Sequence, residues 1–491
     1  MLRRCWPVLA LRVLPILGLA ACATGSGPDA LRTAWLVDQL LDDNRIWLTR
    51  DPDLLATKYR VMADDPYDYV RGSVAVFLAD LGRPATDRPR TSFLTAEGAA
   101  AVLLVVDPHP ENVGTLLPGE GPGPTVDALD VTLPHPAPLL LEINDFDGAA
   151  FGPYLVDVRR ALLGLATAVD PVCDRDCRAP ILTAWARGYV DEVEAIADAG
   201  PTLPPAPPLA TWGYVLDRLL VDAAEEGAER QRLREWTEPT STGLRFRTVP
   251  SPRASGEGIV PLRGDERAQL DRLLAAYQRT ASAPPGFRVL DRARRYGGGV
   301  ASLPAIRYVV AWDRGDDGPD DDEMLEIREV VDPPVVPGLM PVVPTTFDSQ
   351  AARAVAAARA LWSRPDADAR LAGLSDGAMA FKVLTESSFD QAFDHRKLQD
   401  DVRSGRYVPA DLEAWGALLG RQLANVHARS VTVDGDPARD AIAADLAGRG
   451  DAFVAEGLRD AELDLAQARR DHRLMREALD ALGPLLGADR W

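Results

Sequence analysis

The apolar residues of this chain recur mostly three and four positions apart, with short strand-like runs between these helical segments. Helical spacing occurs over residues 30–56, 67–81, 154–169, 181–199, 209–235, 265–281, 412–426 and 438–484. Continuous or alternating apolar runs predict strands over residues 99–106, 139–143, 307–312, 324–331 and 379–384. The pattern therefore predicts a mixed α/β (α+β) fold that is rich in helix.

Two of the predicted strands each lead to an aspartate. The run over residues 99–106 ends at Asp107, and the run over residues 139–143 ends just before Asp145. The residues between them, 114–138, are rich in Gly and Pro and predict a loop. A hairpin-like arrangement of the two strands would bring both carboxylates to one site.

The residues around these aspartates have the spacing of a kinase-type phosphotransfer site. Asn112 follows Asp107 by five positions, and Asp145 comes later in an Asn-Asp-Phe-Asp sequence. In such sites one carboxylate orients the attacking hydroxyl, while an Asn and a later Asp hold the metal ions. We therefore expect a catalytic loop of Asp107, His109 and Asn112, in which Asp107 is the base and His109 braces the loop. Asn112 and Asp145 are the expected metal ligands, and Asp147 either shares the metal or points away. The alternative is that these residues only shape tight turns and cap helices.

The N-terminus predicts export and lipid attachment. Two arginines precede a short apolar run, and Leu19–Cys22 has the small-residue pattern of a lipoprotein cleavage site. We expect residues 1–21 to be removed as a signal peptide and Cys22 to carry the lipid. An ordinary secretory signal or a short membrane anchor are the alternatives. Ala23 after the cysteine favours a lipid anchor in the outer membrane of the cell envelope, facing the periplasm.

The charge of the chain excludes one class of partner. The formal net charge is −20 at pH 7, and the charged residues of segment 1–21 are all arginines, so the exported part is more acidic still. Such a chain repels nucleic acid, and we expect no nucleic-acid partner. Membrane contact is expected through the lipid on Cys22, and a small-molecule or protein partner is left open.

The remaining cysteines and the length complete the outline. Cys173 and Cys177 predict a local disulfide at a helix start in an oxidising compartment, with a metal pair as the alternative. The chain is too long for one usual core, so two lobes are expected. The expected division is a signal peptide (1–21), a tether with the first helix (22–44), a helical lobe with the catalytic loop (45–285), a lobe with a Gly-rich turn and β-hairpin (286–400) and a C-terminal helical segment (401–491).

Six spaced motifs resemble those of the bacterial family called domain of unknown function 2252. That family has an Arg-Gly segment, an Asp-x-His-x-x-Asn-x-Gly loop, Asn-Asp-Phe-Asp, Gly-Pro before an Asp-leading helix, a Gly-rich turn with a following strand, and a late segment with Asn and His. The matching residues here are Arg71-Gly72, Asp107 to Gly114, Asn144 to Asp147, Gly152-Pro153 with Asp157, Gly299 to Tyr308 with Arg328-Glu329, and Ala424 to Ser430. The resemblance covers about residues 45–475.

The family in turn resembles kinase-like proteins, including aminoglycoside phosphotransferases, which implies a two-lobed kinase-like fold. In those proteins the Gly-rich turn and the strand lysine precede the catalytic loop, whereas their counterparts here follow it. The resemblance therefore implies a permuted topology with extra helices. It also implies phosphate or ligand contacts from the turn and the following strand, at Gly299, Ser302, Arg328 and Glu329.

Two further residues receive roles from the resemblance. Arg71 is expected to bind a phosphate or carboxylate, or else to form an ion pair with Asp157 or Glu142. His427 lies on a predicted amphipathic helix, where it is either a satisfied helix histidine or a family-specific polar contact.

The chain departs from the family pattern where a nucleotide would bind. Val106 replaces the glycine before Asp107, Ala301 and Pro304 replace glycines of the turn, and Arg328 replaces the phosphate-binding lysine. Glycine permits close backbone approach to a phosphate, and proline has no N–H to donate. We therefore expect ATP binding to be weak or absent, while Mg²⁺ or Mn²⁺ still binds to the acidic residues.

Three functions follow as hypotheses from these features. The first is an exported, metal-dependent phosphotransferase acting on a small molecule or peptide. The second is a non-catalytic, degenerate kinase-like envelope lipoprotein that binds a ligand, a cation or a partner. The third is a structural envelope lipoprotein with a vestigial pocket. The sequence leaves open whether the chain is an enzyme.

Overall fold

The computed structural model describes residues 27–83, 101–117, 139–199, 214–228, 230–241, 243–252, 256–313, 322–335, 340 and 347–488. The expected signal peptide, Cys22 and most of the loop at 114–138 lie outside these residues. The predicted fold class is confirmed, since the structure is a helix-rich α+β protein. Within the described part, no helix is both long and apolar enough to cross a membrane.

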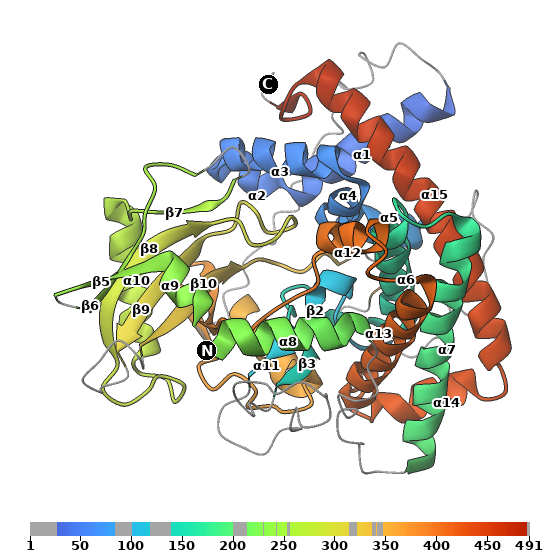
Figure 1. Ribbon diagram of the computed structural model, residues 1–491. Helices are drawn as coiled ribbons and strands as arrows, with labels where there is room; N and C mark the ends of the chain where they lie inside the picture. The colour runs from blue at the N-terminus through green and yellow to red at the C-terminus, as the bar shows by residue number, and fades with distance from the viewer. Residues whose placement is uncertain are drawn as a thin grey trace, which may run out of the picture.

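One lobe is built on a six-stranded antiparallel sheet with the order β11-β12-β10-β9-β8-β7 (Figure 1). Its strands are β7 (Gly258–Val260), β8 (Arg288–Tyr296), β9 (Arg307–Asp313), β10 (Glu323–Val330), β11 (Ala372–Asp376) and β12 (Met379–Glu386). The predicted strand pair at 307–312 and 324–331 is confirmed as β9 and β10. The sequence analysis missed β8, because its four arginines and one aspartate hide the apolar alternation.

Both faces of this sheet are covered. Along β9 the side chains of Tyr308, Val310 and Trp312 point to one face, where helix α10 (Gly264–Tyr277) packs. Val309 and Ala311 point to the other face, against the hairpin of β5 (Thr237–Thr240) and β6 (Gly243–Phe246). Helix α11 (Gln350–Leu361) packs against β11 and β12. The sheet lobe therefore has its own core.

The other lobe is mainly helical and contains the largest apolar core (Figure 1). Its helices are α1 (Pro28–Asp43), α2 (Arg45–Arg50), α3 (Pro52–Asp64), α4 (Pro66–Gly72), α5 (Val74–Gly82), α6 (Leu155–Val169), α7 (Arg175–Ala199), α8 (Tyr214–Ala228), α12 (His395–Arg403), α13 (Pro409–Arg429), α14 (Ala438–Leu446) and α15 (Gly450–Leu482). Helix α9 (Gln231–Trp236) belongs to the sheet lobe, where Leu233 packs with Val309 and Ala311. Helices α7 and α13 cross closely at glycines, where a Cβ on Gly420 would lie 2.0 Å from the carbonyl oxygen of Trp185.

Several predicted helices are divided in the structure. The segment 30–56 forms α1, α2 and the start of α3, and the segment 67–81 forms α4 and α5. Asp51 explains the break before α3, because it caps the N-terminus of a helix that begins with proline. Asp65 caps α4 in the same way, just before the start of segment 67–81. Apolar periodicity continues across these breaks, so the spacing alone did not reveal them.

Two small ribbons lie between the lobes and position the acidic residues. Strand β1 (Ala101–Leu104) pairs with β4 (Ala150–Pro153), and β2 (Val113–Leu116) pairs with β3 (Leu140–Ile143). The expected hairpin of the two Asp-bearing strands is therefore wrong, since β1 and β3 belong to different sheets. Their following loops still meet, because the loop β1–β2 and the turn β3–β4 each connect the two ribbons.

Candidate functional site

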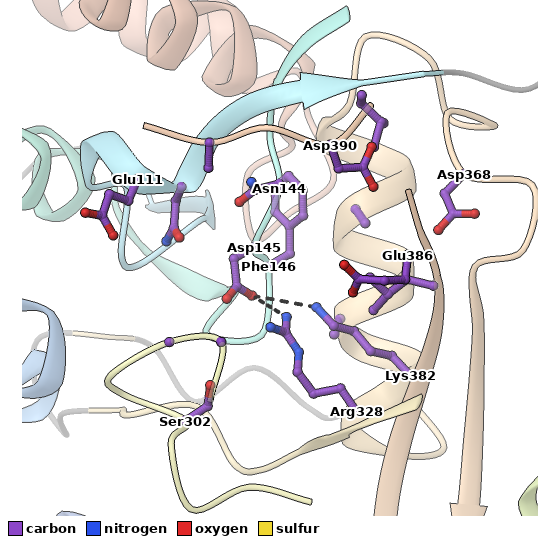
Figure 2. Close-up of a pocket in the computed structure, with 18 of the residues that line it drawn as sticks. Glu111, Asn144, Asp145, Phe146, Ser302, Arg328, Asp368, Lys382, Glu386 and Asp390 are labelled. Carbon is purple, nitrogen blue, oxygen red and sulfur yellow. Dashed lines mark hydrogen bonds and ion pairs between the residues drawn. The ribbon is translucent and has the colours of Figure 1, made fainter. Parts of the chain in front are cut away.

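A cavity of about 370 Å³ lies between the two lobes (Figure 2). The helical lobe and the two ribbons contribute the predicted acidic residues, and the sheet lobe contributes cationic residues and the Gly-rich turn. The lining of the cavity includes Arg71, Asp107, His109, Asn112, Asp145, Gly298, Gly299, Ser302, Arg328 and Lys382. Most of the predicted site residues therefore converge in one place.

Asp107 is held at the end of β1 by a buried arginine. The Nε of Arg160, on α6, donates to Asp107 Oδ1 at 2.7 Å, and its Nη2 donates to the carbonyl oxygen of Val70 at 2.6 Å. The side-chain amide of Asn112 donates to the main-chain oxygen of Asp107 at 2.8 Å. Because the amide nitrogen is used inside the loop, the amide oxygen of Asn112 is the atom left for a metal or ligand.

The backbone before Asp107 is fixed by a second buried carboxylate. Asp157, which leads α6, accepts hydrogen bonds from the N–H groups of Val105 and Val106, each at 2.8 Å. Val106 has φ 78°, in the left-handed region that favours glycine and is unfavourable for a β-branched residue. The family's glycine at this position is thus explained by the turn of the backbone into the catalytic loop.

His427 supports this arrangement from outside the cavity. Its Nε2 lies 3.2 Å from Asp157 Oδ2, and its Nδ1 lies 2.7 Å from the hydroxyl of Tyr189. Glu329 also lies elsewhere, where it binds Arg50 and accepts from the N–H of Ile306 at 3.0 Å. Neither is among the described residues that line the cavity, so their expected ligand contacts are not supported.

His109 is enclosed below the catalytic loop. Burial lowers the pKa of His109 to about 4, so the ring is neutral near pH 7. Its ring contacts Tyr67 edge-on with centroids 6.1 Å apart, and Nε2 lies 3.7 Å from Asp107 Oδ2. Nδ1 makes no hydrogen bond with any residue that the structure describes. This neutral, packed ring fits the predicted bracing role.

Arg71 lines the cavity, but its ion-pair partners differ from those expected. Arg71 Nη1 lies 2.6 Å from Glu111 Oε2 and 3.4 Å from Asp68 Oδ1. The expected alternatives, Asp157 and Glu142, have other partners in the structure. Asp157 binds the backbone before Asp107, and Glu142 binds Ser363. The sequence could not identify these partners because they come from distant segments.

Asp145 faces two cations of the sheet lobe, Arg328 and Lys382 (Figure 2), and Asp147 contacts the same two cations. Arg328 lies 3.2 Å from Asp145 and 2.8 Å from Asp147, and Lys382 lies 3.7 Å and 2.5 Å from the same two carboxylates. Burial alone would raise the pKa of Asp145, but Arg328 and Lys382 outweigh it and hold that pKa well below its usual range. Asp147 is thus turned toward the cations, and it is not among the described residues that line the cavity.

Lys382 was missed as a site residue by the sequence analysis. It lies on β12 directly across from Arg328 of β10, so both side chains reach the same acidic pair. Only three lysines occur in a chain whose basic residues are almost all arginines, and this rarity was the one available signal. Arg353 of α11 was missed as well, and it donates to the carbonyl oxygens of Asp147 and Ala149.

The Gly-rich turn between β8 and β9 covers one side of the cavity. Gly297, Gly298 and Gly299 have φ values of 88°, 97° and 140°, which side-chain-bearing residues rarely adopt. A Cβ on Gly298 would come within 3.1 Å of Arg307 Nη1. The other guanidinium nitrogen, Arg307 Nη2, donates to Ser302 Oγ at 2.6 Å. The glycine requirement therefore falls on residues 297–299 of the turn.

Ala301 and Pro304, which replace glycines of the family pattern, differ in their position relative to the cavity. Ala301 lines the cavity, while Pro304 is not among the described residues that do so. Pro304 therefore removes no donor from the cavity itself. Of the departures expected to weaken phosphate binding, Ala301 and Arg328 remain in contact with the cavity.

Cys173 and Cys177 are joined in a disulfide, with their Cα atoms 5.2 Å apart. Cys173 precedes α7 and Cys177 lies in its first turn, and neither cysteine is among the described residues that line the cavity.

The fold and the cavity define a two-lobed α+β protein with a charged site between its lobes. Residues 50–478 match the protein family described as "Uncharacterized protein conserved in bacteria (DUF2252)", and the chain belongs to this family. No curated protein and no solved structure matches the chain.

Proposed function

We propose that this protein is a metal-dependent phosphotransferase that acts on a small molecule or peptide. One observation carries the proposal. Asp107, Asn112 and Asp145 line the same cavity as Arg328, Lys382 and the Gly-rich turn, and they come from opposite lobes. Acidic residues on one wall suit metal ions, and cations with glycine backbone on the other suit phosphate oxygens.

The order of elements in the sheet lobe supports a kinase-like arrangement. The Gly-rich turn joins β8 to β9, and the next strand, β10, carries Arg328. In protein kinases a Gly-rich loop likewise covers the phosphates and the phosphate-binding lysine lies on the third strand. Here the catalytic loop precedes these elements in the chain, so the proposed kinase-like fold is permuted.

In this proposal Asp107 is the base that accepts the proton of the attacking hydroxyl. Arg160 fixes its orientation, and Asp157 fixes the backbone that presents it. Asn112 and Asp145 would hold Mg²⁺ or Mn²⁺, which neutralises the charge on the phosphate oxygens when bound. Arg328 and Lys382 would then hold phosphate oxygens in place of the carboxylates that they contact in this structure.

A second candidate is a non-catalytic binding protein with the same cavity. The ion pairs of Asp145 and Asp147 with Arg328 and Lys382 favour it, because these contacts satisfy the acidic and cationic groups without a ligand. Export to a compartment with little ATP also favours it. We propose the same localisation for both candidates, a lipid anchor on Cys22 in the outer membrane.

Titration calorimetry with the full chain in detergent tests the proposal. We expect heat from Mn²⁺ or Mg²⁺ that disappears in Asp145→Ala, and weak, metal-dependent ATP binding, because Arg328 and Lys382 must first release the carboxylates. Phosphate transfer should be lost in Asp107→Asn while metal binding is kept. Metal heat with no nucleotide binding under any condition would support the non-catalytic candidate. Absence of metal heat in the unaltered protein would refute the metal-dependent phosphotransferase.

A further inference from the structure

We infer that Asp65, Asp68 and His395 form a second divalent-metal site, suited to Zn²⁺, behind the catalytic loop. Asp65 and Asp68 lie at the N-terminus of α4, and His395 begins α12. Potential ligand atoms of these three residues all lie within 4.8 Å of one another. The site joins two helices that are far apart in the sequence, and it does not depend on the proposed phosphotransferase activity.

The imidazole of His395 points its second nitrogen at the two aspartates. His395 is 5% exposed, and its Nε2 makes no hydrogen bond with any residue in the described part of the chain. The nearest carboxylate oxygen recorded for it is Asp65 Oδ1 at 3.7 Å. This buried ring nitrogen is held by an ion-pair contact with Asp65 and by no shorter hydrogen bond in the described part of the chain, so it is the donor that a metal ion would take in place of that contact.

Glu111 sets the orientation of the ring. Its Oε1 lies 2.6 Å from His395 Nδ1 and also accepts from the main-chain N–H of His395 at 3.1 Å. Metal-binding histidines commonly donate their other ring N–H to a carboxylate, which fixes the tautomer. Glu111 and Asp394 also lie within ligand distance of His395. That side is less suitable, because Glu111 already occupies Nδ1 and Asp394 caps α12.

The distances require only a small closure around an ion. Zinc binds nitrogen and oxygen at about 2.0–2.2 Å, so the ligand atoms of a tetrahedral site lie about 3.4 Å apart. The separation of 3.7 Å between His395 Nε2 and Asp65 Oδ1 is close to this value. Mixed imidazole and carboxylate ligands favour Zn²⁺ over Mg²⁺, which prefers oxygen ligands and retains water. Water would supply a fourth ligand.

Two arginines compete for the carboxylate of Asp68. Arg396 Nη2 lies 2.8 Å from Asp68 Oδ2, but its side chain is 62% exposed and can move into solvent. Arg71 is closer to Glu111, at 2.6 Å, than to Asp68, at 3.4 Å. Asp65 accepts from the N–H groups of Tyr67 and Asp68, and a carboxylate has acceptor sites beyond these bonds.

Zinc titration calorimetry under non-reducing conditions tests this site in the full chain purified in detergent. We expect the Asp145→Ala variant, which lacks the cavity ligand, to bind one Zn²⁺ as the unaltered protein does. His395→Gln should weaken zinc binding by more than about tenfold, and Glu111→Gln should weaken it by about 10–100-fold. His472→Gln is the matched control, because His472 is also buried but binds a backbone carbonyl, that of Ala63, at 2.9 Å.

The variants also separate metal binding from folding. If His395→Gln unfolds, Asp68→Asn serves in its place, with circular dichroism confirming its fold. Zinc affinity unchanged in a folded His395→Gln or Asp68→Asn protein would overturn the inference. So would the absence of zinc binding by the unaltered protein, which would mean that the cluster is an ion-pair network only. Loss of binding in Asp145→Ala alone would assign the zinc to the cavity and overturn it equally.

Discussion

The strained turn into the Asp107 loop predicts an unusual response to glycine substitution. Val105 and Val106 are neighbours, are 1% and 0% exposed, and donate to the two oxygens of Asp157 at the same distance of 2.8 Å. They differ in backbone conformation, because only Val106 has a positive φ, of 78°. We expect Val106→Gly to destabilise the protein clearly less than Val105→Gly.

The magnitude follows from three contributions. Each substitution removes a buried valine side chain, which contributes about 1.5–3 kcal/mol, and adds about 0.5–1 kcal/mol of backbone entropy in the unfolded state. Val105→Gly should therefore lower the free energy of unfolding by about 2–4 kcal/mol. In Val106→Gly the relief of about 1–3 kcal/mol of backbone strain offsets much of that loss. The difference between the variants isolates the strain at Val106.

Urea unfolding followed by circular dichroism measures this difference. Both variants keep the backbone N–H that Asp157 accepts, so the hydrogen bonds are matched, and equal urea dependence of the two transitions makes their midpoints comparable. Equal midpoints, or a lower midpoint for Val106→Gly, would falsify the claim that Val106 is strained. The family's glycine at this position would then need another explanation.

Three further predictions concern separate parts of the chain. Lys382→Met should lower the free energy of unfolding by about 3 kcal/mol, because it removes the buried ammonium group of this ion pair and leaves the half-buried carboxylate of Asp147 with one partner fewer. Lys397→Met should lower it by at most about 1 kcal/mol, because Lys397 forms its ion pair with Asp222 at the surface, where the lysine side chain is 64% exposed; equal urea midpoints for the two variants would contradict this contrast. His109 has a pKa of about 4, below the ordinary value of about 6.5, so the unfolded chain takes up this proton first as the pH falls. The contribution of neutral His109 to the free energy of unfolding is therefore full above about pH 6.5 and is lost as the pH falls toward 4. His109→Gln should reduce this acid-induced loss of stability by about 3 kcal/mol. A pH profile of urea midpoints that is the same in the variant and the unaltered protein would count against the prediction. Cys22→Ser should move the protein from the membrane to the soluble fraction without changing its urea midpoint, and its recovery in salt-washed membranes would reject lipid attachment.

The acidic loop of the site could be predicted from the sequence because its residues are close to one another in the chain. One tight loop separates Asp107 from Asn112. An apolar run that precedes Asp107, and another that precedes Asp145, each mark the end of a buried strand. The spacing of these residues therefore predicted which acidic residues form the site and that they lie in one cavity. The pairing of the strands was wrong, because each four-residue strand carries too little pattern to choose between partners.

The supporting residues could not be predicted because their partners are distant. Asp157 acts on the backbone some fifty positions earlier, and Lys382 reaches Asp147 from a strand of the other lobe. His395 reaches Glu111 across 284 positions. The residues next to a single histidine or lysine in a helix or strand form no pattern that predicts which distant residue it contacts.

The sequence by itself determined the helix-rich α+β class, the acidic loop and the separate Gly-rich turn, since periodicity and turn chemistry are properties of neighbouring residues. Only the tertiary structure decided which charges meet. It brought Arg328 and Lys382 against Asp145 and Asp147, because antiparallel pairing of β10 with β12 places both cations on one face of the sheet. Burial then turned these contacts into the dominant electrostatic feature of the cavity, since charges removed from water must find partners.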